Sequence, residues 1–199
     1  MKLSKRGEYA LRSLINLGIA AEVGRSLVQV SELADNEQLP IKFLEQIMQS
    51  LKEEGLVVSA RGKFGGYRLA KPPKEITIGR VVRSIDGPLA PIGCVSQTAY
   101  TKCTCPDEEH CGLRMLMLDV RNAIAGILDR YTLADVVEVT LRKLRRDNLP
   151  LPFSPEAEAA GAPVRVSARH ARRLANANNK PRLDATEGVL HQLLGDYSI

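Results

Sequence analysis

The chain has 199 residues, of which 44% are hydrophobic and 26% charged, a globular composition with enough length for one domain and an appendage. Its formal net charge is +5, which permits binding to nucleic acid without demonstrating it. The apolar run 14–21 is too short to cross a bilayer, and no apolar signal-peptide segment follows the basic start. We therefore expect a cytoplasmic protein with no membrane partner.

The first two helices are predicted from apolar periodicity and capping residues. Residues 5–21 form a helix with one apolar face, and residues 22–27 form a loop. Ser31 is a suitable N-cap for a short second helix that runs through Asn36. A turn at Leu39 leads into a third helix, and this spacing is that of a helix-turn-helix.

The stretch from Pro40 to Gly55 predicts one long amphipathic helix. Pro40 suits the first turn, where its missing N–H costs nothing, and Gly55 suits the C-terminal end. The apolar residues recur at helical spacing on one face: Leu44, Ile47, Met48 and Leu51. The other face carries long polar side chains: Lys42, Glu45, Gln46, Gln49 and Lys52.

A short β-hairpin with a basic turn follows this helix. Residues 56–60 are β-prone, residues 61–66 read Arg-Gly-Lys-Phe-Gly-Gly, and residues 67–69 resume the strand. Such a hairpin is often only a solvated turn. Here a helix-turn-helix precedes it, and residues 61–69 contain basic but no acidic side chains. The pattern favours a winged helix, whose third helix enters the major groove while the wing touches the backbone or minor groove.

The second half begins with a short helix and continues into a long one. Thr77 caps a helix that Gly87 ends, and residues 89–112 have no period. From Leu113 an apolar stripe continues to Tyr131. Because this stripe exceeds what one small winged-helix domain can bury, we interpret it as a dimerisation helix; the alternative is packing within its own chain.

The last predicted helix is followed by a linker and a tail. Thr132 and Asp135 resemble a capping box for a helix that ends near Arg146. Residues 149–163 are rich in proline and then alanine, which is typical of a linker. Residues 164–199 carry a basic cluster and are expected to be flexible.

All four cysteines lie in one polar loop: Cys94, Cys103, Cys105 and Cys111. Thiolates gathered in this way can hold a soft metal or an iron–sulfur cluster. Their spacing is not the paired C-x2-C of a zinc ribbon, although a zinc site and a thiol switch remain alternatives. Four inert buried thiols are the least favoured interpretation in so polar a loop.

Several motifs together resemble the Rrf2 family of bacterial transcriptional regulators. They are residues 2–10 (KLSKRGEYA), Leu44-Glu45-Gln46, Gly55-Leu56-Val57, Arg61-Gly62 and Gly65-Gly66-Tyr67, and the resemblance covers residues 1 to about 147. The resemblance implies a mostly α fold with a small β-wing, namely a winged helix-turn-helix plus a long dimerisation helix. It also implies a homodimer that binds double-stranded DNA.

Many members of this family hold an iron–sulfur cluster in the same loop. The cysteines whose positions match the family's ligands are Cys94, Cys105 and Cys111. One branch adds a histidine three residues after the last cysteine, where this chain has Arg114; another adds an acidic residue near the N-terminus of the partner subunit, where this chain has Glu8. Glu8 of the partner subunit or the extra Cys103 is therefore the expected fourth ligand, and the cluster is [2Fe–2S] or [4Fe–4S].

We predict a DNA-binding regulator that senses iron, cluster status, nitric oxide or redox state. The residues expected at base edges are Lys42, Glu45 and Gln46, and those expected at the backbone or minor groove are Arg61, Gly62 and Lys63. The alternative is a cluster-free member controlled by thiol oxidation or by a partner enzyme. An enzyme is remote, since no catalytic triad, phosphate loop or paired acids are visible. The expected organisation is a DNA-binding region (1–87), a cysteine loop (88–112), a dimerisation helix with a following helix (113–148), and a linker with its tail (149–199).

Overall fold

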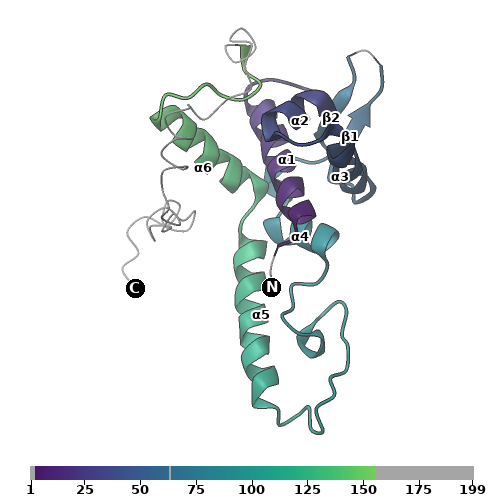
Figure 1. The fold of residues 1–199 in the computed structure, drawn as a ribbon. Helices are drawn as coiled ribbons and strands as arrows, with labels where there is room; N and C mark the ends of the chain where they lie inside the picture. Colours follow the sequence, from purple (N-terminus) through teal and green to yellow (C-terminus); the bar gives the residue numbers. More distant parts are fainter. Residues whose placement is uncertain (1–2, 63, 156–199) are drawn as a thin grey trace, which may run out of the picture.

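The computed structural model describes residues 3–62 and 64–155, which form a mostly helical fold with one two-stranded antiparallel sheet. This result confirms the predicted fold class. In chain order the elements are α1 (Lys5–Glu22), α2 (Val30–Glu37), α3 (Ile41–Glu53), β1 (Val57–Ala60), β2 (Gly66–Leu69), η1 (Pro73–Glu75), α4 (Ile78–Asp86), η2 (Gly93–Val95), α5 (Gly112–Arg130) and α6 (Leu133–Arg146). Figure 1 shows α5 projecting from the winged-helix part, with its first residues at the far end, and α6 beginning next to α1.

The cap of α2 differs from the prediction. The helix begins at Val30, and its N-cap is Gln29 instead of Ser31. The Glu32 carboxylate accepts a hydrogen bond from the Gln29 backbone N–H at 2.9 Å. In the reverse direction, the Gln29 side chain accepts one from the Glu32 backbone N–H, which completes a capping box. Ser31 therefore lies inside the first turn. At the other end, Gln38 adopts a left-handed backbone with φ of 55°, which turns the chain toward α3.

The apolar face of α3 is fully buried, as its periodicity predicts. Its core residues are all 0% exposed: Leu44, Ile47, Met48 and Leu51. They belong to one core with apolar residues of α1, α2 and β1, among them Leu14, Leu33 and Val57. Burial of each aliphatic side chain stabilises the fold by roughly 1.5–3 kcal/mol. This packing fixes α3 and leaves its polar face outward.

The wing is bonded to the helix-turn-helix as well as to itself. The register of β1 and β2 places Val57 opposite Leu69. Tyr67 on β2 donates its N–H to the Val28 carbonyl at 2.8 Å and accepts from the Val28 N–H at 3.0 Å. Gly66 is required for this approach, because a Cβ there would lie 2.5 Å from the Val28 oxygen. The base of the wing is therefore fixed relative to α2.

The long helix α5 is anchored at one end and exposed along its length. Thr77 caps α4 as predicted, accepting from the Arg80 N–H at 3.3 Å. Arg83 of α4 binds Asp129 near the end of α5 through two hydrogen bonds of 2.6 Å. The apolar stripe of α5 remains between 37% and 57% exposed at four positions: Leu113, Leu116, Val120 and Ile127. No helix within residues 3–62 and 64–155 is long and apolar enough to cross a membrane.

Helix α6 packs back against α1. The predicted capping box is confirmed, with the Thr132 N–H donating to an Asp135 carboxylate oxygen at 2.8 Å. Val137 lies against Gly18 of α1, where an added Cβ would be 2.6 Å from a valine methyl group. Leu141 joins the same core. This helix therefore completes the winged-helix core in addition to following α5.

The chain after α6 does not begin as the expected linker. Phe153 is 9% exposed and belongs to the core, and Leu151 packs against that core. The Ser154 N–H donates to the Leu151 carbonyl at 3.2 Å, which closes a turn. The proline-rich sequence here carries an aromatic anchor. The rest of the predicted linker and tail, residues 156–199, lies outside the described residues.

Phe153→Ala is expected to lower the free energy of unfolding by about 3 kcal/mol, since it removes a buried aromatic ring and leaves a cavity. Urea denaturation followed by circular dichroism measures this change. Met115→Ala is the matched control, because Met115 is 58% exposed and its truncation should leave the midpoint unchanged. Equal stability of the two variants would contradict a structural role for residues 149–155.

Candidate functional site

The polar face of α3 is open to solvent. Lys42, Glu45 and Gln46, the residues predicted at base edges, are all exposed and line one shallow groove. Arg6 of α1 lines the same groove, and its guanidinium donates a hydrogen bond to the Ser50 hydroxyl on α3. Sequence analysis does not single out Arg6, because only the packing of α1 beside α3 brings it to this surface.

The turn of the wing presents a second part of this surface. Arg61 and Gly62 are exposed, and Gly62 has a φ of 108°, which glycine adopts without strain. The Gly65 N–H donates to the Gly62 carbonyl at 2.9 Å and closes the turn. A groove lined by Ile41 and Arg61 separates the wing from the helix-turn-helix. Lys63, the third predicted wing contact, lies outside the described residues.

The loop between α4 and α5 forms a pocket lined by all of its cysteines. This cavity has a volume of about 310 Å³ and contains in its wall Cys94, Cys103, Cys105 and Cys111. Cys94 is buried in η2, Cys103 and Cys111 are half-buried, and Cys105 is exposed. Cys111 is also the N-cap residue of α5. The fold therefore gathers the four thiols at the start of the long helix.

The thiols influence one another around the pocket. Cys103 affects the pKa of both Cys94 and Cys105, and Cys111 affects the pKa of Cys105. The backbone N–H and thiol of Cys105 lower the pKa of Cys103, whereas Cys103 raises the pKa of Cys105 to about 11. Burial raises the pKa of Cys94. The four thiols thus form one electrostatically connected set.

The donor atoms in the pocket wall are of the kind that binds an iron–sulfur cluster. Among residues 3–62 and 64–155, no group of three or more thiol, imidazole or carboxylate side chains lies close enough together to hold a metal ion. An iron–sulfur cluster holds several irons between its cysteines, so its thiolates stand around a cavity. Soft sulfur donors in the wall of one cavity therefore fit the chemistry of a cluster.

Arg114, three residues after the last cysteine, supports the loop. Its Nε donates to the Cys94 carbonyl at 3.4 Å and lies 3.2 Å from a Glu108 carboxylate oxygen. His110 lies 2.6 Å from Asp107, and its side chain is 82% exposed. Because His110 is outside the pocket wall, the structure does not bring it to the thiols.

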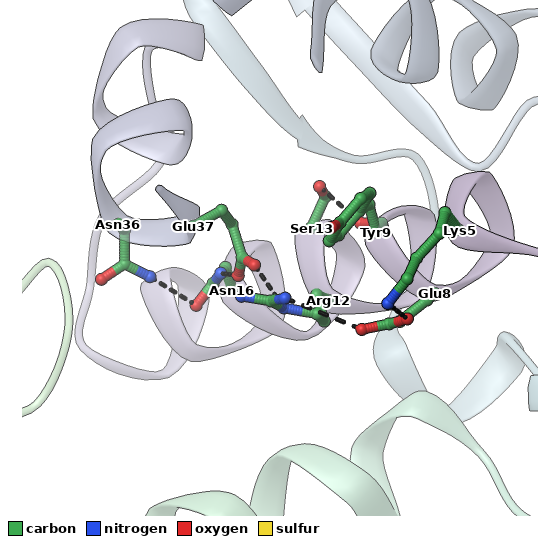
Figure 2. Close-up of polar contacts among 8 residues, drawn as sticks. All are labelled: Lys5, Glu8, Tyr9, Arg12, Ser13, Asn16, Asn36 and Glu37. Atoms are coloured by element: carbon green, nitrogen blue, oxygen red, sulfur yellow. Dashed lines mark hydrogen bonds and ion pairs between the residues drawn. The ribbon is translucent and has the colours of Figure 1, made fainter. Parts of the chain in front are cut away.

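Glu8 lies on α1 (Figure 2). It is not among the residues that line the cysteine pocket of its own chain. Its carboxylate is 2.8 Å from Lys5 Nζ and 3.9 Å from an Arg12 nitrogen. The hydrogen bond from Lys5 is the main reason that the pKa of Glu8 is below its usual value. The side chain is 40% exposed, so an ionised carboxylate is presented to solvent.

Arg12 also joins α1 to the end of α2 (Figure 2). It forms an ion pair with Glu37, which is 7% exposed. The Asn16 amide donates to the same carboxylate, and Asn36 donates to the Asn16 oxygen at 3.1 Å. Burial raises the pKa of Glu37 against the opposing effect of Arg12. Sequence periodicity does not reveal this network, because its members come from two helices.

The start of α1 is bonded to the end of α4. The Ser4 N–H donates to an Asp86 carboxylate oxygen at 2.8 Å, and the Ser4 hydroxyl donates to the other oxygen. Gly7 is needed for this approach, because a Cβ there would lie 2.6 Å from the carboxylate. Since Asp86 directly precedes the cysteine loop, α1 is connected to the start of that loop.

Comparisons with known proteins match most of the described chain. The model of the Rrf2 family, described as iron-dependent transcriptional regulators, matches residues 3–139. An Rrf2-like helix-turn-helix regulator of Rhodobacter capsulatus is 37% identical over 139 residues, covering 68% of this chain and 91% of its own. The regulator CymR of Bacillus subtilis is 32% identical over 140 residues, covering 70% of this chain and 92% of its own.

Solved structures of transcriptional regulators also superpose on this chain. The structure of CymR, titled as the global cysteine regulator of B. subtilis, superposes with a TM-score of 0.59 at 30% identity, covering 69% of this chain and 97% of CymR. That of T. potens IscR superposes with a TM-score of 0.54 at 26% identity, covering 69% of this chain and 87% of IscR. These relatives are transcriptional regulators and not enzymes. The chain therefore belongs to the Rrf2 family of winged helix-turn-helix transcriptional regulators.

Proposed function

We propose that this protein is a dimeric DNA-binding regulator whose affinity for its operator is controlled by an iron–sulfur cluster in the cysteine pocket. The observation that carries the proposal is the gathering of four thiols in the wall of one cavity at the start of α5. In this proposal the cluster, of [2Fe–2S] or [4Fe–4S] type, supplies sensitivity to iron, nitric oxide or redox state. The protein supplies the thiolates and converts cluster status into DNA affinity.

Three of the thiols are the proposed ligands: Cys94, Cys105 and Cys111. Two groups are candidates for the fourth position. Glu8 of the partner subunit would bring a hard, exchangeable oxygen ligand, whereas Cys103 lies in the same pocket wall and would complete an all-sulfur set. The exposed, ionised carboxylate of Glu8 supports the first choice, and the position of Cys103 between Cys94 and Cys105 supports the second.

The exposed stripe of α5 is the proposed dimer surface. Leu116, Val120 and Ile127 recur at the spacing that lines one helix face, and each is between 37% and 56% exposed. Two such helices packed face to face would bury both stripes and would place two recognition helices on one duplex. A dimer would also bring α1 of one protomer toward the cysteine pocket of the other, as ligation by Glu8 requires.

The exposed face of α3 and the wing are the proposed DNA surface. Gln46 suits adenine, Glu45 can accept from cytosine, and Lys42 suits guanine or a phosphate. Arg61 and Gly62, with Lys63 from the sequence, are proposed at the backbone or minor groove. Contacts to bases would fix the operator sequence, while the wing would fix the position on the duplex.

Two sets of contacts connect the pocket to this surface. Ser4 and Asp86 tie the start of α1 to the residue before the cysteine loop. Arg12 and Glu37 tie α1 to the end of α2, the first helix of the helix-turn-helix. Gain or loss of the cluster would reorder the loop and shift the population of dimers with correctly spaced recognition helices.

A cluster-free regulator is the second candidate function. The similarity to CymR supports it, as does the presence of Cys103 and Cys105 in the wall of one pocket. Such a protein would respond to thiol oxidation or to a partner enzyme. An absorption spectrum of the anaerobically purified protein, with iron and sulfide analysis, separates the two: visible absorption with stoichiometric iron supports the cluster, and a colourless iron-free protein supports the alternative.

Gln46→Ala is expected to weaken specific binding by about 1–3 kcal/mol and to relax the preference at one base position. Arg61→Ala should weaken binding to all sequences alike and reduce the dependence of log K on log salt by about one unit, because one phosphate contact is lost. Fluorescence anisotropy with specific and random duplexes at several salt concentrations measures both effects. Identical behaviour of the two variants would refute this division of roles.

Leu116→Glu is expected to give folded monomers that lose operator binding, since an unpaired charge is costly in an apolar seam. Light scattering measures the mass, and circular dichroism confirms folding. Leu116 is 56% exposed in the single chain, so the change should not disturb its core. The control is Asn122→Glu, which places the same charge on an exposed residue away from the stripe. A variant dimer of unchanged affinity would exclude this face as the interface.

Replacement of Cys94, Cys105 or Cys111 by alanine is expected to abolish iron binding, because each removes a thiolate ligand. Glu8→Ala should retain iron but alter the spectrum and speed cluster loss in air, and Cys103→Ala should have the smallest effect. Iron content and anaerobic spectra of the full chain measure these outcomes. Loss of iron in Cys103→Ala together with a harmless Cys105→Ala would assign the ligands as Cys94, Cys103 and Cys111.

A further inference from the structure

Two positively charged side chains stand beside the thiols in the wall of the cysteine pocket. Arg114 from the first turn of α5 and Lys102 from the loop both line this cavity, and the described residues of its wall include no carboxylate. Thiols hold iron as thiolates, so a cluster bound there carries a net negative charge. The wall therefore combines soft anionic ligands with positive charge.

Two contacts to the Nε atom hold the Arg114 side chain against the loop. Nε donates to the Cys94 carbonyl at 3.4 Å and lies 3.2 Å from a Glu108 carboxylate oxygen. The Tyr100 hydroxyl lies 2.9 and 3.0 Å from the two Glu108 oxygens, so that carboxylate is itself held. A guanidinium carries further N–H donors on its terminal nitrogens. Within residues 3–62 and 64–155 these donors have no hydrogen-bond acceptor, so they are available to a group in the pocket.

A guanidinium can stabilise a cluster but cannot ligate iron. It stays protonated and acts only as a donor of hydrogen bonds, whose acceptors here would be thiolate and sulfide sulfurs. When the cluster accepts one electron from a reductant such as a reduced flavin, its charge becomes more negative by one unit. No bond of the arginine breaks and no proton is transferred. Hydrogen bonds from a cation are stronger to the more negative state, so they favour reduction.

We propose that Arg114 sets the reduction potential of the cluster by donating hydrogen bonds from its terminal nitrogens to cluster sulfurs. Glu108 and Tyr100 are positioning residues, because they hold Nε while the terminal nitrogens reach the sulfurs, and Lys102 adds charge. This inference rests on the proposed cluster and identifies its oxidation state as the signal that the protein reads. The raised potential brings reduction within reach of weaker reductants.

The test uses the full-length protein, purified anaerobically with its cluster, in a redox titration followed by visible absorption. Arg114→Gln should lower the equilibrium constant for reduction about tenfold, which is a fall of about 59 mV in the midpoint potential for one electron. Arg114→Lys keeps the charge but loses the forked donors, so its potential should lie between those of Arg114→Gln and the unmodified protein. The matched control is Arg130→Gln, which removes the same charge from an exposed residue at the other end of α5 and should leave the potential unchanged.

The same variants without iron separate this role from a structural one. The Arg114 side chain is 35% exposed, so iron-free Arg114→Gln should melt at the same temperature as the iron-free unmodified protein. A clear fall in its melting temperature would assign Arg114 a structural role and overturn the proposal.

Resonance Raman spectra report the hydrogen bonds directly, because a hydrogen bond to sulfur changes the iron–sulfur stretching frequencies. The shift of these bands on transfer to D2O should shrink in Arg114→Gln. An unchanged potential in this variant would overturn the proposal but leave cluster control of DNA binding intact. If Arg114→Gln holds no cluster, Arg114→Lys decides, and a potential equal to that of the unmodified protein refutes the proposal. If the unmodified protein itself binds no iron, this proposal and cluster control both fail.

Discussion

The packing of α1 at the centre of the molecule is the interaction on which the other elements depend. Its buried residues, among them Ala10, Leu14 and Leu17, lie in the same core as residues of α2, α3, α4 and α6. Because α2 and α3 both pack on α1, the helix-turn-helix has no independent core. The orientation of the recognition helix is therefore a property of α1 and of whatever holds α1 in place.

Two polar attachments modify this apolar packing at the first half of α1. At the start of α1, Ser4 donates hydrogen bonds to Asp86. In the middle of α1, Arg12 forms an ion pair with the buried Glu37. A carboxylate that is 7% exposed is costly to bury, so its ion pair and amide partner constrain geometry more than they add stability. The same stretch of α1 carries Glu8. One helix thus connects the recognition surface, the start of the cysteine loop and a candidate ligand.

Local signals in the sequence were sufficient for most of the fold. The amphipathic pattern of α3, the Thr77 cap and the Thr132–Asp135 capping box act over a few residues, and all are present in the structure. The prediction of Ser31 as the N-cap was wrong, because Gln29 and Glu32 form a capping box two residues earlier. The prediction relied on the preference of N-caps for short hydroxyl side chains, and glutamine is not such a residue. The Arg6–Ser50 contact and the anchor at Phe153 depend on residues far apart in the chain, so no local pattern contains them.

The contact between Gly18 of α1 and Val137 of α6 has a consequence for how the chain folds. It joins the first and last helices of the described structure. The central core is therefore complete only when the chain from α1 through α6 is present and folded. Contacts of such long sequence separation slow folding and leave apolar surface open in the meantime. During synthesis, α1 would leave the ribosome long before α6 could cover it. Helix α3, which packs on α1, would therefore reach its final orientation late in folding.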